Sequence, residues 1–76
     1  MRVIVRSSDL VLISFVEATL RDEGLDPFVA DRFMSAVEGG ISAFPQRVLV
    51  PSDQWASACR MLEVAGLGAE IVRDGQ

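Results

Sequence analysis

The sequence predicts an α+β fold with the element order β-α-β-β-α-β. Three observations predict it. Four short runs are rich in β-branched or aliphatic residues, two longer runs place apolar residues at helical spacing, and glycines or prolines separate the runs. The 76 residues suffice for a single domain at residues 1–73, followed by a polar tail at residues 74–76.

The chain begins with a predicted strand and helix. Residues 2–6 (Arg-Val-Ile-Val-Arg) have β-branched residues at the centre, which is typical of a strand. Residues 7–9 (Ser-Ser-Asp) offer three side-chain oxygens that can cap a helix at residues 10–23. Gly24 is the predicted stop of this helix.

The first predicted helix carries two apolar stripes. One face of a sheet can cover the first stripe, which consists of Leu12, Ile13, Val16 and Leu20. The second stripe contains Val11 and Phe15 and is more apolar than the surface of a monomer requires. Two interpretations stay open: either Phe15 packs at the core edge or under a loop, or Val11 and Phe15 form a contact between subunits.

Two further strands follow, with an irregular segment between them. The second strand is predicted at residues 25–31, where Pro27 restricts it to a sheet edge or to a late start. Residues 32–44 have no clean period and are predicted as a loop or a distorted hairpin connection. The third strand is predicted at residues 46–50, between two prolines.

The second helix and a last strand complete the chain. Ser52 is a suitable N-cap, the helix presents Trp55, Ala58, Leu62 and Ala65 on its apolar face, and Gly66 ends it. The last strand is predicted at residues 69–73. Right-handed crossovers then place both helices on one face of a four-stranded antiparallel sheet, which is the ferredoxin-like arrangement. This arrangement leaves the other face open and implies no function by itself.

Composition and charge narrow the functional classes. The chain has 7 basic and 11 acidic residues, a formal net charge of −4, and its basic residues are scattered arginines. This pattern argues against nucleic acid and anionic membranes as partners. No apolar run approaches the roughly 18–20 residues that span a bilayer. The single cysteine and the absence of a signal segment predict a cytoplasmic location.

The residue types that most catalytic sites need are missing. The chain has no histidine, which excludes imidazole metal sites and histidine general bases. Cys59 therefore lacks an activating base, and we expect it to pack as a small hydrophobe. The carboxylates show no catalytic spacing. The sequence predicts neither an enzyme nor a metal or other cofactor.

Residues 31–44 are the stretch most indicative of function, because a connection of this length in a compact domain usually has a role. It forms either a hairpin whose apolar residues close the core, or a loop that binds a small ligand or a protein partner. In the second interpretation Arg32 and Arg47 attract an anionic group, and backbone N–H groups near Gly39 and Gly40 assist. The candidate residues are Asp31, Arg32, Met34, Ser35, Glu38, Gly39, Gly40 and Arg47.

Several blocks of sequence together resemble a known family. They lie at residues 6–9, 12–18, 29–31, 34–35, 38–39, 45–50 and 58–66. Over residues 1–68 the chain is similar to small bacterial domains named "putative prokaryotic signal-transducing proteins", which are grouped by fold with PII-like regulators. The resemblance implies a ferredoxin-like fold, a regulatory or ligand-sensing role, and no catalytic residues. The chain departs from the family pattern at residues 32–33, where members often carry a polar residue and a histidine.

Two functions are therefore expected. The first is a small non-enzymatic regulatory module for signal transduction, which binds a small ligand or a protein partner through residues 31–44. The second is a homo-oligomerisation module with no small-molecule ligand, which associates through Phe15 and the open sheet face.

Overall fold

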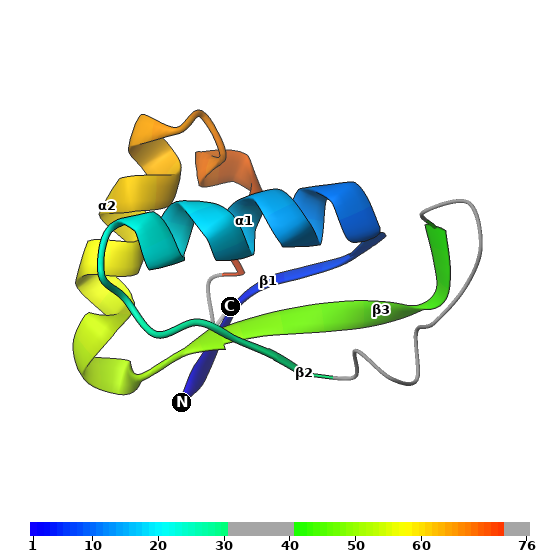
Figure 1. The fold of residues 1–76 in the computed structure, drawn as a ribbon, viewed down its shortest axis with the longest axis horizontal. Helices are drawn as coiled ribbons and strands as arrows, with labels where there is room; N and C mark the ends of the chain where they lie inside the picture. The colour runs from blue at the N-terminus through cyan, green and yellow to red at the C-terminus, as the bar shows by residue number, and fades with distance from the viewer. Residues whose placement is uncertain (31–40, 73–76) are drawn as a thin grey trace.

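A computed structural model gives the fold, and it describes residues 1–30 and 41–72, without the side chains of residues 41–44. The described chain is α+β, with two helices and a three-stranded antiparallel sheet of order β1-β3-β2. Figure 1 shows both helices on the same side of the sheet. The elements are β1 (Arg2–Asp9), α1 (Leu10–Asp22), β2 (Phe28–Ala30), β3 (Ile41–Val50) and α2 (Trp55–Val64), with 3₁₀ turns η2 (Ser52–Gln54) and η3 (Gly68–Glu70).

Strand β1 contains a β-bulge at Ile4. Val3 pairs with Leu49 and Val5 pairs with Val48, so Ile4 is an extra residue on β1. A bulge places two successive side chains on the same side of a sheet, which regular alternation forbids. Ile4 and Val5 are accordingly both 0% exposed. The bulge thus lets a short strand supply two adjacent residues to the core.

Strand β3 begins five residues earlier than predicted. The structure starts it at Ile41, so residues 41–44 continue the strand although the sequence placed them in a loop. Pro45 lies inside this central strand, where a proline normally breaks the ladder. It is tolerated because it falls where the register shifts: Ser7 pairs with Gln46, but Asp9 pairs with Ile41. Between these two pairs, β3 thus covers five residue positions whereas β1 covers only two.

Strand β2 agrees with both consequences expected of Pro27. It covers only Phe28–Ala30, directly after the proline, and lies at the edge of the sheet. Its last predicted residue, Asp31, lies outside the described residues. Strand β2 contacts only the second half of β3, through the pairs of Phe28 with Leu49 and of Ala30 with Arg47.

The predicted fourth strand is not found in the described part of the chain. After α2 the backbone turns through η3, and residue 73 lies outside the description. What remains is a single antiparallel bridge from Ile71 to Val5 and a bond from the Val72 N–H to the Ile4 carbonyl, at 2.7 Å. Because the 3₁₀ turn occupies residues 68–70, only two described residues are left to lie along the outer edge of β1.

Residues next to the helices in the sequence determine where α1 begins and where both helices end. The Asp9 carboxylate accepts hydrogen bonds from the backbone N–H groups of Val11 and Leu12, at 3.0 and 3.3 Å, and caps α1 as predicted from residues 7–9. Gly24 adopts φ +81°, and the Leu25 N–H bonds the Leu20 carbonyl at 3.1 Å, which satisfies an orphan carbonyl of the last turn. Gly66, at φ +83°, ends α2 in the same way.

The start of α2 differs from its prediction. Ser52 is not the helix N-cap; it lies in η2, and α2 begins three residues later. The preceding Gln54 turns its side chain to the loop between α1 and β2. Its Oε1 accepts from the Asp26 N–H and its Nε2 donates to the Asp26 carboxylate, both at 2.9 Å. These two bonds tie the start of α2 to the loop.

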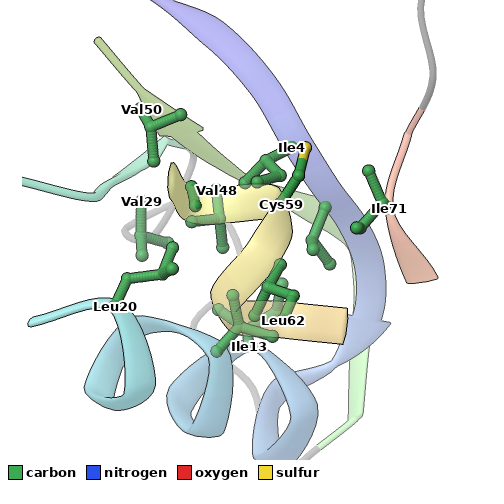
Figure 2. Close-up of a cluster of buried hydrophobic side chains, with 12 residues drawn as sticks. Ile4, Ile13, Leu20, Val29, Val48, Val50, Cys59, Leu62 and Ile71 are labelled. Carbon is green, nitrogen blue, oxygen red and sulfur yellow. The ribbon is translucent and has the colours of Figure 1, made fainter. Parts of the chain in front are cut away.

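The core lies between the helices and the sheet, where the labelled side chains of both layers point toward one another (Figure 2). Helix α1 buries three residues of its predicted first stripe, while Leu12 is partly buried. Helix α2 buries Ala58, Cys59 and Leu62, whereas Ala65 caps the helix and is exposed. No helix in the described residues is long and apolar enough to cross a membrane.

Candidate functional site

The face of the sheet away from the helices carries side chains that the core does not use. Residues directly opposite each other on antiparallel strands point to the same face. Val48 and Val50 of β3 are buried beneath the helices, so Arg47 and Leu49, which alternate with them, lie on the other face. Their partners on β1 and β2 lie there too. We call this surface the open face.

A row of apolar residues crosses the open face. Leu49 lies at its centre, paired with Val3 of β1 on one side and with Phe28 of β2 on the other. Val3 and Leu49 are half-buried, and Phe28 is 56% exposed. Adjacent strands lie about 4.7–4.9 Å apart, so this apolar row extends about 10 Å across three strands.

The next row along the strands contains two arginines. Arg47 pairs with Arg6 of β1 and with Ala30 of β2. Arg6 is exposed and Arg47 is half-buried. Directly opposed residues have Cβ atoms about 4.5–5.5 Å apart, so the two positive side chains leave the sheet from neighbouring points. We call this the arginine row. Guanidinium groups bind carboxylates and phosphates through paired N–H donors, so the row is chemically suited to an anion.

The bulge at Ile4 is what brings Arg6 to this row. In a regular strand Arg6 would share a face with Ile4, two residues away. The extra residue shifts the alternation, so that Val3 and Arg6 are on the open face while Ile4 and Val5 are in the core. Bulges often re-aim a side chain in this manner near binding sites.

The residues predicted to bind a ligand are described only in part. Arg47 lies in the arginine row. Asp31, Arg32, Met34, Ser35, Glu38, Gly39 and Gly40 lie outside the described residues. The chain enters that segment directly after Ala30, which is the third member of the arginine row. Sequence reasoning missed Arg6, Val3, Leu49 and Phe28, because their juxtaposition depends on strand register.

The predicted second stripe of α1 is exposed. Val11 is 72% exposed and Phe15, one turn further along the helix, is 51% exposed. Phe15 is therefore not a core residue. Whether it makes the subunit contact considered from the sequence stays a prediction.

Cys59 and Trp55 have structural surroundings. Cys59 is 8% exposed and belongs to the core cluster, which agrees with its expected packing as a hydrophobe. Trp55 is partly buried against the same cluster, and the Arg2 guanidinium carbon lies 3.8 Å from the centroid of its ring. This cation–π contact accounts for Arg2 on the helix side of the sheet. Within residues 1–30 and 41–72, no group of three or more His, Cys, Asp or Glu residues could hold a metal ion.

Comparison with known proteins identifies a family. No curated protein matches the sequence. The sequence model of one family, described as "Putative prokaryotic signal transducing protein", matches residues 1–66. These residues include the two helices and three strands of the described chain, together with every member of the two rows. The chain belongs to the family that carries this description.

Proposed function

We propose that the chain is a small non-enzymatic regulatory module that recognises an anionic group through the arginine row. The observation that carries the proposal is the direct opposition of Arg6 and Arg47 on the open face. The description of the family supports a signal-transducing role for such a module.

The two arginines of the row carry like charges at directly opposed positions. Like charges directly opposite each other destabilise a sheet, by about 0.2–1 kcal/mol for cross-strand pairs. Two adjacent guanidinium groups concentrate positive charge at one point of a chain whose net charge is −4. Such a pair is stabilised most when a carboxylate or phosphate binds between or above the two guanidinium groups.

Amide-resolved NMR tests this proposal. The labelled protein is titrated with a pool of anionic metabolites, including nucleotides, sugar phosphates and carboxylates. We expect shifts centred on Arg6, Ala30 and Arg47, and their loss in the double variant Arg6→Gln/Arg47→Gln. The matched control is Arg60→Gln, which removes an exposed arginine from α2. Shifts that survive the double variant, or no shifts with any anion, would contradict recognition of a small anion.

Self-association through α1 is the second candidate function. The exposure of Val11 and Phe15 favours it, because adjacent large apolar side chains on a helix surface are typical of interaction sites. If the stripe joins two copies, Phe15→Asp converts an oligomer to a monomer in light scattering. The matched control is Ser14→Asp, which adds the same charge at an exposed neighbouring position. A monomeric mass for the wild type at high concentration would exclude this candidate.

We also infer the finer ferredoxin-like arrangement. Val5 pairs with Val48 of β3 on one side, so the bridge to Ile71 lies along the opposite edge of β1. This is where the fourth strand of that arrangement would lie, beside β1 in the order β1-β3-β2. Slow hydrogen exchange of the Val72 amide, which donates to Ile4, supports the inference; exchange as fast as at the chain end contradicts it.

A further inference from the structure

The hydrogen-bonded pair of Asp26 and Gln54 joins two parts of the fold that are 28 positions apart in the sequence. Gln54 directly precedes α2, and Asp26 lies in the loop that leads from α1 into β2. Only Pro27 separates Asp26 from the first residue of β2. We propose that this pair is a latch that holds β2 against the sheet, and that β2 opens as a unit when the latch is broken. This inference does not depend on which group the arginine row binds.

The latch fixes the loop at two points. The Asp26 N–H donates to the Gln54 Oε1, and the Gln54 Nε2 donates to the Asp26 carboxylate, both at 2.9 Å. The first bond holds the backbone of the loop and the second holds its side chain. The second bond also ends on a charged acceptor, and such bonds are roughly twice as strong as bonds between neutral groups. The loop therefore cannot move away from the start of α2 without breaking both bonds.

Other contacts hold the α2 side of the latch in place. The Gln54 N–H donates to the Pro51 carbonyl at 2.8 Å, which closes η2. The next residue, Trp55, packs against the core cluster, and the Arg2 guanidinium carbon lies 3.8 Å from the centroid of its ring. These contacts remain when the two bonds to Asp26 are lost. The loop and β2 are therefore the parts that move.

Strand β2 is easier to detach than the other two strands. It has three residues and lies at the edge of the described sheet, next to β3. Only Val29 of these three is buried, while Phe28 is 56% exposed. Segments that bury little apolar surface open locally at a lower free energy than the whole domain needs to unfold. A latch next to such a strand therefore controls the opening of β2 more than the global stability.

Opening of β2 changes the open face. Phe28 belongs to the apolar row and Ala30 to the arginine row, so each row loses one member when β2 leaves the sheet. The backbone groups of β3 that β2 had paired then need other hydrogen-bond partners. Breaking the latch at the start of α2 thus changes the other side of the sheet. A ligand that contacts β2 and β3 together favours the closed latch in return.

Amide hydrogen exchange measured by NMR tests the inference. Gln54→Glu places a carboxylate against the Asp26 carboxylate and removes the donor of the second bond. Gln54→Ala removes both bonds without adding a charge. Each variant should speed the exchange of the protected amides of residues 28–30 about tenfold. The amides that join β1 to β3 should stay within about twofold of their wild-type rates. Circular dichroism verifies that each variant folds.

A rescue variant and a control separate the latch from a general effect of charge. The double variant Asp26→Asn/Gln54→Glu exchanges the amide and the carboxylate, so both hydrogen bonds can form again with their side-chain roles reversed. Exchange at β2 should return to within about threefold of the wild-type rate. The control Ser52→Glu adds the same charge at an exposed position of η2 and should leave exchange at β2 unchanged.

Each other outcome contradicts the inference. If both Gln54 variants speed the amides of β2 and those between β1 and β3 equally, β2 opens only with the whole domain. If neither variant changes exchange at β2, or if the double variant exchanges as fast as Gln54→Glu, the pair is not a latch. If the wild-type amides of residues 28–30 exchange as fast as in an unstructured peptide, nothing holds β2 against the sheet.

Discussion

The two faces of the sheet come from the same strands but carry different kinds of side chain. The helix side is mainly aliphatic and buried, with Val48 and Val50 at its centre. The open side places two arginines opposite each other and an exposed phenylalanine in the neighbouring apolar row. Packing explains most of the helix side, since its buried residues other than Gln46 are apolar and belong to one core cluster. The open side carries positive charge, which is why we propose that it takes part in recognition.

The largest expected effect tests the bulge that separates the two faces. Ile4→Ala and Val5→Ala should each lower the free energy of unfolding, by about 2–5 kcal/mol for Ile4 and somewhat less for Val5. Both side chains are 0% exposed, so both substitutions leave a cavity. Urea denaturation measures the loss. In a regularly alternating strand only one of the two substitutions would be costly, and that result would contradict the bulge.

A second comparison uses neighbours on β3 that face opposite sides. Val48→Ala should cost about 2–3 kcal/mol, because it empties a fully buried site. Leu49→Ala removes more carbon atoms but should cost only about 1 kcal/mol, because Leu49 lies on the open face and is half-buried. Urea denaturation of the two variants measures the two losses in the free energy of unfolding. A larger loss for Leu49→Ala would mean that the open face is covered in the folded chain.

The local part of this fold could be predicted from the sequence. Residues 7–9 and Gly24 mark the ends of α1 because a cap and a positive φ depend on neighbouring residues. Gly66 marks the end of α2 for the same reason. The early start of β3 was missed because Pro45 normally excludes a strand. The 3₁₀ turn at residues 68–70, in place of strand, has no sequence signal that we recognised.

The candidate site depends on long-range pairing, which the sequence does not display. Arg47 was identified from its charge, but its partner Arg6 lies 41 positions earlier in the sequence and faces it only through the register of β1 and β3. That register depends in turn on the bulge at Ile4. The run Val-Ile-Val at residues 3–5 fits a regular strand as well as a bulged one, because all three side chains are apolar. Hence the sequence could predict that the sheet has an open face, but it could not predict the apolar row and the arginine row on that face.

The smallest expected effect distinguishes recognition from structure at the arginine row. Arg6→Gln should leave the free energy of unfolding unchanged or raise it by up to about 0.5 kcal/mol, because it relieves repulsion from Arg47. Added salt should reduce this increase in the free energy of unfolding, because salt screens the repulsion. The contrast is Arg21→Gln, which removes a 2.8 Å ion pair with Glu17 on α1 and should lose about 0.3–0.5 kcal/mol. Thermal or urea unfolding at low and high salt measures both. A loss above about 1 kcal/mol for Arg6→Gln would show that its guanidinium holds the fold together, and the row would then need no ligand to explain it.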